Sequence, residues 1–233
     1  MKERQLVWDL PVRVFHWSLA ASFAGAYALA ESERWRNVHV TLGYTVMGLI
    51  VFRLIWGFVG THYTRFASFR YAPSQAITYL REIATGRARH YVGHNPAGSW
   101  AVYALLALGL ATGVSGYLNF NEVGGDVMEE THEVLANLWL LVVGLHVAGV
   151  VVSSLAHREN LARAMVTGYK LGAGSSVGGG APAIAVGVAL AGAVLGFWTW
   201  SALGGAGPIG AAEAQETHDG EHAFEENDES DDD

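Results

Sequence analysis

Long apolar runs alternate with short polar connections along most of the chain. Five runs lie near residues 12–30, 39–59, 98–118, 132–155 and 183–204. Each is long enough to cross the apolar core of a bilayer as a helix, which takes about 20 residues. The pattern predicts an all-α membrane protein, with a four-helix transmembrane bundle and a fifth transmembrane helix near the C-terminus.

The five runs differ in their polar content. The third and fifth carry no charged residue, whereas the first, second and fourth contain histidine or arginine. Lipid tolerates such side chains only when they have a partner. The polar chemistry of the protein is therefore expected on the first, second and fourth helices.

The connections suggest where the chain divides. PSQAITYLREIATG (73–86) has apolar residues at helical spacing and is expected to lie along the membrane surface. GAGSSVGGGAP (172–182) has the composition of a flexible linker. We therefore expect a bundle over 1–171, a linker over 172–182, the added helix over 183–206 and a disordered acidic tail over 207–233.

Composition supports the assignment to lipid and excludes some chemistry. Hydrophobic residues make up 51% and charged residues 15%, against roughly 25% charged in soluble proteins. There is no cysteine, which excludes disulfides, thiolate metal sites and haem attached through C-x-x-C-H. Residues 213–233 hold 11 of the 22 acidic residues and no Lys or Arg, so the rest of the chain is mildly basic. No nucleic-acid partner is expected.

Basic residues concentrate on one side of the predicted spans. Residues 1–13, 53–89 and 158–170 contain all Lys and Arg except Arg34 and Arg36. The opposite side carries the acidic stretch NEVGGDVMEE (121–130). Because cytoplasmic loops are rich in Lys and Arg, the N-terminus is expected in the cytoplasm of a bacterium and the C-terminus in the periplasm, with the protein in the inner membrane.

A cleaved leader is an alternative for the first run. YALAES (27–32) is similar to a signal-peptidase site after an apolar stretch. The stretch also contains Asp9, Pro11, Arg13 and His16 and is long for a signal peptide. We therefore expect it to stay as the first helix.

The fourth run begins and ends on histidine, HEVLANLWLLVVGLH, from His132 to His146. Fourteen helical residues span about 21 Å, with an angular offset of about 40°. Both imidazoles therefore face the same side of the bundle, one near each membrane surface.

Each of these histidines has a candidate partner at its own depth. His39 opens the second run on the outer side, level with His132, and His16 lies about one turn inside the first run, level with His146. A bis-imidazole haem needs one histidine from each of two helices. A single membrane histidine is more often a hydrogen-bonded core residue, but four at two matching depths favour two b-type haems, held by His39–His132 and His16–His146.

Other residues have weaker roles in this hypothesis. Arg13 and Arg53 could bind propionates of the inner haem, or could be cytoplasmic arginines that reach for water. His157 is an alternative ligand, although it lies at the water boundary. His62, His90, His94, His218 and His222 have no clear spanning partner. Glycines 109, 113 and 116 favour close helix packing over a porphyrin slot.

Several segments, in order, resemble the bacterial cytochrome b561 family, which includes the cytochrome b subunit of nickel–iron hydrogenases. They are VWDLPVRVFHW (7–17), VHVTLGY (38–44), FRLIWGFVGTHYTRFASF (52–69), YVGHNPAGSW (91–100), HEVLANLWLLVVGLH (132–146) and HRENLARAMVTGYK (157–170). The resemblance covers about residues 5–170. It implies a four-helix core in which His16, His39, His132 and His146 bind two b haems, and electron transfer between quinone and an outside partner. The fifth helix and the acidic tail depart from the family.

The resulting hypothesis is an electron-transfer cytochrome that connects the quinone pool with a periplasmic redox protein such as a c-type cytochrome. The acidic tail could dock that protein, or could be only a solvated segment. The alternatives are a membrane-anchor subunit of a larger oxidoreductase such as a hydrogenase, a superoxide:quinone oxidoreductase, and a transporter with proton-relay histidines.

Overall fold

The computed structural model describes residues 3–172 and 179–204. Most of the predicted linker 172–182 and all of the predicted tail 207–233 lie outside the described residues. The elements are β1 (Glu3–Leu6), α1 (Leu10–Ala28), η1 (Glu33–Trp35), α2 (Arg36–Val59), η2 (Phe66–Phe69), α3 (Pro73–Ala84), α4 (Pro96–Phe120), α5 (Gly125–His157), α6 (Leu161–Thr167), β2 (Tyr169–Gly172) and α7 (Ala181–Ala202).

Four segments of the described chain are helical, long and apolar enough to cross a membrane. They are Glu33–Val59, Pro96–Phe120, Gly125–His157 and Ala181–Ala202. α1 coincides with the first predicted span, but it has only 19 residues and includes Arg13 and His16, and it is not among those four. The protein is a mostly helical membrane protein, and the count of five spans stays a prediction.

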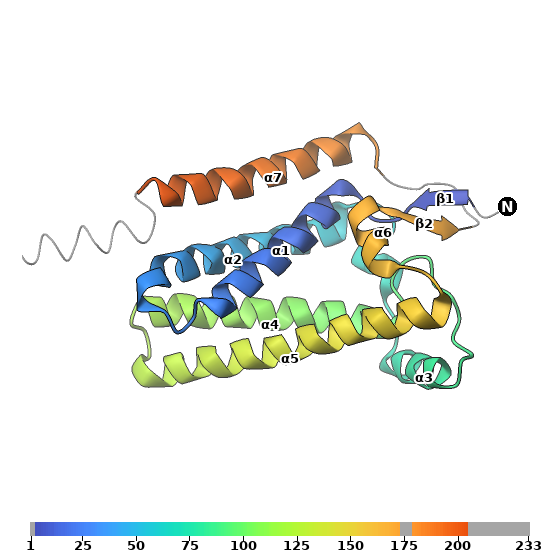
Figure 1. The fold of residues 1–233 in the computed structure, drawn as a ribbon, viewed down its shortest axis with the longest axis horizontal. Coiled ribbons are helices and arrows are strands. Elements are labelled where there is room, and N and C mark those ends of the chain that lie inside the picture. Colours follow the sequence, from blue (N-terminus) through green and yellow to red (C-terminus); the bar gives the residue numbers. More distant parts are fainter. Residues whose placement is uncertain (1–2, 173–178, 205–233) are drawn as a thin grey trace, which may run out of the picture.

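The long helices run lengthwise side by side (Figure 1). α1 packs on α2, α4 packs on both α2 and α5, and α7 lies against α1 with a smaller contact to α2. α3, α6 and the two strands gather at one end of the bundle (Figure 1). α3 confirms that residues 73–84 form a helix.

The core lies where these long helices meet. It is built from Phe15 of α1, three residues of α2, Leu106 of α4, Trp139 of α5 and Val194 of α7. Gly109 of α4 makes this packing possible, since a Cβ there would come within 2.6 Å of both Ile50 and Trp139. Gly113 likewise contacts Met47. These two glycines therefore serve helix packing, the alternative that the sequence favoured.

The two short strands were not expected from the sequence. β1 pairs antiparallel with β2, with Glu3 opposite Gly172 and Leu6 opposite Tyr169. The backbone N–H groups of Val7 and Trp8 continue the contact by donating to the carbonyl of Gly168. The N-terminal segment is thereby fixed beside the segment that follows α6.

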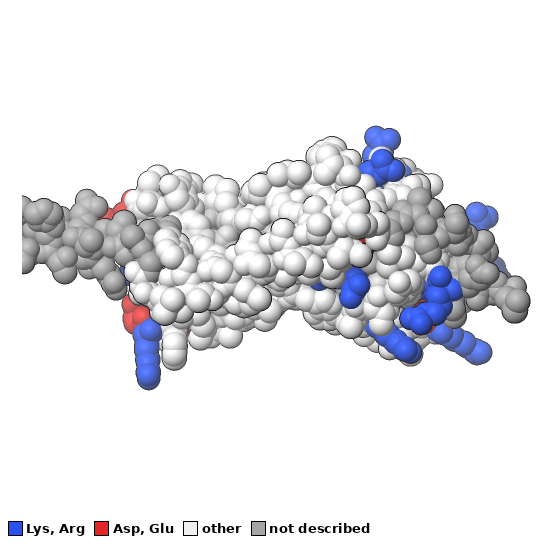
Figure 2. All heavy atoms as spheres, turned by 90° about the horizontal axis from the view of Figure 1, so that it is seen from above, with Lys and Arg blue, Asp and Glu red and all other residues white. Residues whose placement is uncertain are grey.

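Charge is segregated along the molecule. Figure 2 shows most Lys and Arg side chains at the end that carries β1, β2 and α3, then a long face without charge, then a few acidic and basic side chains at the other end. This distribution suits a membrane protein. The basic end corresponds to the predicted cytoplasmic side.

Candidate functional site

His39 at the start of α2 and His132 in α5 lie close together, and we call them the outer pair. The Nδ1 atom of His39 is 2.8 Å from the carbonyl oxygen of Ala26, and Nδ1 of His132 is 3.0 Å from that of Thr112. A carbonyl can only accept, so Nδ1 carries the proton in both rings. Nε2 is then the atom with a free lone pair in each, which is how metal-binding histidines are usually oriented.

The outer pair also has the separation that a shared metal requires. The ring centroids are 6.3 Å apart and the ring planes are nearly perpendicular, at 86°. A metal–imidazole bond is about 2 Å long, and each ring centre lies about 1 Å behind its nitrogen, so two rings on opposite sides of one metal have centroids roughly 6 Å apart. The observed separation agrees with this value.

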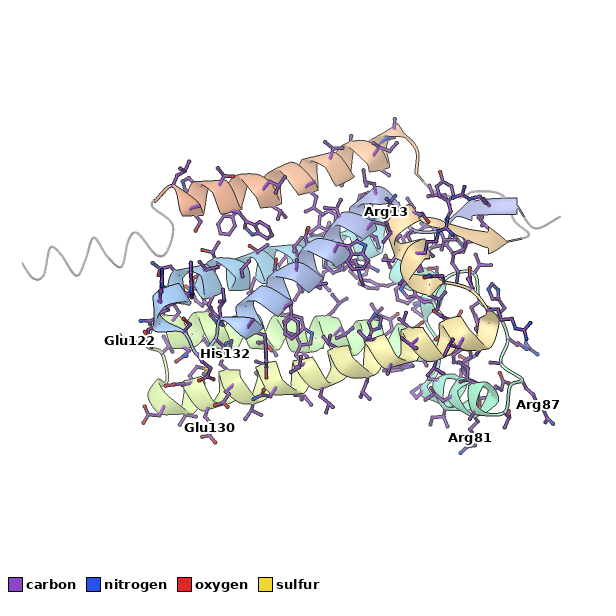
Figure 3. All side chains as sticks on the ribbon, viewed as in Figure 1. Arg13, Arg81, Arg87, Glu122, Glu130 and His132 are labelled. Carbon is purple, nitrogen blue, oxygen red and sulfur yellow. The ribbon has the colours of Figure 1, made fainter. Side chains whose placement is uncertain are left out.

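α4 shapes the surroundings of His132. A Cβ on Gly116 would lie 2.8 Å from Cε1 of His132, so only glycine leaves room for the ring in this position. Ser115 Oγ lies 3.2 Å from Nδ1 of His132 and itself donates to the Thr112 carbonyl. Figure 3 shows His132 near the end of the bundle that carries Glu122 and Glu130, away from Arg81 and Arg87.

His16 of α1 and His146 of α5 form the second group, which we call the inner pair. They are close enough for their charges to interact. Nδ1 of His16 is buried and has no hydrogen-bond partner within the described part of the chain. The structure shows that His16 and His146 are near each other, but it does not show a ring-to-ring contact like that of the outer pair.

Trp139 and Phe23 separate the two levels. Trp139 is seven residues from both His132 and His146 along α5, and it is buried with 3% of its surface exposed. Its ring centroid lies 4.4 Å from that of Phe23 in α1. The two aromatic rings therefore occupy the middle of the bundle and exclude water from it.

Polar groups without partners gather at the inner level. Arg53 of α2 is buried, donates from Nη2 to the Thr64 carbonyl, and lies over the Phe66 ring. Its Nη1 has no partner among the residues that the structure describes, and the same holds for Nδ1 of His94. A bound anionic group such as a haem propionate would satisfy both atoms. The role of Arg53 as a propionate ligand stays a prediction.

His94 is the residue that the sequence reasoning passed over. It precedes α4 and is half-buried, with a fully buried Nδ1, and its ring centroid lies 4.7 Å from that of Trp8 and 4.3 Å from that of Phe69. Burial lowers the pKa of His94 to about 3, helped by the nearby Arg53, His146 and Lys170. Nothing in the sequence indicates this environment, because His94 lies in a polar connection and its contacts with Trp8 and Phe69 are between distant segments.

Arg13 occupies a different surface. It lies on the wall of a groove between α1 and α7, and its buried Nε has no partner in the described chain. Figure 3 shows it near the junction of α1 with α6. The predicted role of Arg13 at the inner haem is not tested by this placement and stays a prediction.

Asp9 anchors the helix that carries His16. Its Oδ1 accepts from the Val12 N–H and so caps α1. Its Oδ2 accepts from Trp56 Nε1 at 3.0 Å and from Thr61 Oγ1 at 2.8 Å. A buried carboxylate with these donors fixes the start of α1 against the end of α2.

Three other described histidines lie outside the two pairs, namely His157, His90 and His62. His157 Nε2 is 3.2 Å from the Tyr79 hydroxyl, and His90 Nε2 is 2.9 Å from Glu159, which also pairs with Lys170. Burial lowers the pKa of Lys170, and Glu159 opposes the shift. His62 is exposed, and His218 and His222 lie outside the described residues.

Two histidines at each level are too few to hold a metal alone. Among the described residues there is no group of three or more His, Cys, Asp or Glu side chains that could bind a metal ion. Paired imidazoles instead suit a group such as haem, whose porphyrin supplies the other ligands. The donor set of this chain therefore fits haem.

Comparison with known proteins gives one match. A family model described as prokaryotic cytochrome b561 matches residues 7–168. The match includes α1 to α6 and ends before α7. No curated protein and no solved structure matches the chain.

Proposed function

Because the chain belongs to the prokaryotic cytochrome b561 family, whose members bind b-type haem and transfer electrons across membranes, we propose that it carries two haems, one at each histidine pair. The outer pair would ligate one iron through the Nε2 atoms of His39 and His132. The inner pair, His16 and His146, would ligate the other. Haem bound at these sites supplies reversible one-electron chemistry.

The observation that carries this proposal is the geometry of the outer pair. Two rings from different helices have their Nδ1 protons directed to backbone carbonyls, and their centroids are 6.3 Å apart. Two core histidines that only form hydrogen bonds would not be expected to combine these Nδ1 contacts with this ring separation. The backbone carbonyls fix the tautomer and orientation of each ring.

The rest of the chain supports electron transfer in physical ways. Arg53 and His94 offer donors to propionates at the inner level. Trp139 and Phe23 fill the space between the levels and exclude water, which keeps the surroundings of both sites at low dielectric. Burial and the histidines that would hold each haem would together set its potential.

The haem count tests this proposal directly. The purified full chain should contain two b haems per polypeptide in a pyridine haemochrome assay. His132→Ala and His146→Ala should each retain one, and they should lose spectrally different haems. His62→Ala, at an exposed histidine, should retain both. A pale wild-type protein, or two haems retained in His146→Ala, would refute the two-haem arrangement.

We further propose that the electrons pass between membrane quinone and a redox protein on the outer side, in a bacterial inner membrane. The acidic stretch 213–233, with 11 carboxylates and no Lys or Arg, supports a basic partner such as a c-type cytochrome. Charge attraction acts mainly on the association rate and is screened beyond roughly 8–10 Å.

Deletion of 213–233 should slow reduction of a basic cytochrome c at low salt and have little effect at high salt. Equal rates of wild type and deletion at both salts would exclude the docking role.

A further inference from the structure

A groove of about 370 Å³ runs between α1 and α7 at the depth of the membrane. Its walls are mostly apolar, and its lining includes Arg13 and Trp17 of α1 and Ala191 and Trp198 of α7. The volume is within the range of small-molecule sites, which are typically apolar with a few polar groups. One wall belongs to α7, which lies outside the family match.

α7 is held firmly enough to form a wall. Trp198 Nε1 donates to Thr45 Oγ1 of α2 at 2.9 Å, and Ser201 Oγ lies 2.7 Å from Thr41 Oγ1. At the other end Gly187 permits close contact with Leu10, since a Cβ there would lie 2.6 Å from Leu10 Cγ. The groove is therefore bounded at both ends by specific contacts.

The groove has one strong hydrogen-bond donor, Arg13. Its Nε is buried and has no partner within the described residues, and an unsatisfied buried donor costs free energy. The half-buried Arg13 side chain also lines the groove, so a ligand with a carbonyl oxygen there would accept from the guanidinium N–H groups that face it. Trp17 and Trp198 provide aromatic surface beside this donor, which suits a flat ring.

The groove also lies beside the inner pair. Trp17 lines it, and the Trp17 ring makes an edge-on contact with the His16 ring, at a centroid distance of 5.0 Å. A ring bound against Trp17 would therefore be separated from the His16 side of the inner site by one side chain. A phospholipid could also enter the groove with its phosphate at Arg13, but its acyl chain lacks a flat ring to stack on the indoles.

We propose that the α1–α7 groove binds the ring of a membrane quinone, with Arg13 donating to one of its carbonyl oxygens. This rests on the quinone-linked function proposed above and adds the place of exchange. Oxidation of a quinol in the groove would break both O–H bonds. Both protons would pass to water at the basic end. Both electrons would pass, one at a time, to the haem that His16 and His146 would hold, and reduction of a quinone would reverse each transfer.

Two matched variants on α7 test the site. Ala191 lines the α1–α7 groove, whereas Ala193 lines a second groove of about 300 Å³ between α2 and α7. In the haem-loaded full chain in nanodiscs, decylubiquinol should reduce haem about tenfold more slowly in Ala191→Phe, equivalent to ~1.4 kcal/mol. Ala193→Phe should stay within about twofold of wild type, and both should keep the wild-type haem content.

A binding measurement on the wild-type chain gives an independent readout. A photoreactive azido-ubiquinone should label peptides of α1 or α7 that line the groove, and excess decylubiquinone should prevent the labelling. Labelling elsewhere, with normal rates in both variants, would overturn the groove site but leave quinone exchange intact. The same holds if phospholipid, and not quinone, competes with the label, which would identify a lipid site. No haem reduction by quinol in wild type would instead refute the quinone-linked function itself.

Discussion

Gly116 of α4 lies directly against the imidazole of His132, so that a Cβ at position 116 would come within 2.8 Å of Cε1 of the ring. The ring is also held by the hydrogen bond that its Nδ1 donates to the carbonyl of Thr112, one turn earlier in α4. His132 therefore cannot rotate away from a new methyl group without breaking this bond.

Gly116→Ala should consequently disturb the outer site. We expect a shifted low-spin haem signal in the EPR spectrum for one haem, or loss of that haem, while the other signal stays unchanged. Gly144→Ala in α5 is the control, because nothing lies within 4 Å of a Cβ there. Identical spectra for Gly116→Ala and wild type would show that His132 is not held in this orientation.

Asp9→Asn should destabilise the protein substantially. The amide would place N–H groups where Oδ2 now accepts from Trp56 and Thr61, and a buried group with mismatched hydrogen bonds costs about 1–3 kcal/mol. Asp126→Asn, at an exposed residue in the first turn of α5, should cost less than about 1 kcal/mol. Thermal unfolding in detergent compares the two, and equal melting temperatures would contradict the structural role of Asp9.

His94 should make stability depend on pH. Its pKa in the folded chain is about 3, below the ordinary 6.5. Between these values the unfolded chain binds a proton that the folded chain does not, so stability falls as pH falls from 6.5 towards 3. The slope is at most about 1.4 kcal/mol per pH unit. His94→Gln should lack this component, and parallel stability curves for wild type and variant from pH 7 to pH 4 would show that His94 is accessible to protons.

Thr45→Val should loosen α7. The change removes the acceptor for Trp198 Nε1 and leaves that N–H unpaired, at a cost of about 1–3 kcal/mol. Thr199→Val is the matched control, since its hydroxyl donates only to Leu195 within the same helix. Melting temperatures should fall clearly in the first variant and little in the second. A similar small change in both would mean that the Trp198 contact contributes little to the packing of α7.

The sequence predicted the long helices well because their signal is local. Apolar runs of about 20 residues have few alternatives to a helix in lipid, and the structure has helices at all five positions. The sequence also predicted that His39 and His132 lie at the same depth, because each is at the outer end of its run, and their ring centroids are 6.3 Å apart. That prediction needed only the helical rise per residue and the fact that successive spans cross the membrane in opposite directions. The role of His39 and His132 as haem ligands stays a prediction.

Other features depend on contacts between distant segments, which the sequence does not display. His94 is half-buried because its ring meets Trp8 and Phe69, which lie far from it in the sequence. Arg13 lines a groove because α7 packs on α1. The β1–β2 ribbon joins two four-residue strands far apart in the chain, and neither has a pattern long enough to predict a strand.

The ribbon has a consequence for how the protein is made. Residues 3–6 leave the ribosome long before residues 169–172, their only strand partners among the described residues. The ribbon can close only after α5 and α6 have been synthesised, and long-range pairing of this kind forms late. Closure of the ribbon would therefore follow the packing of α1 to α6. It would place residues 169–172 beside the start of α1 before α7 enters the membrane.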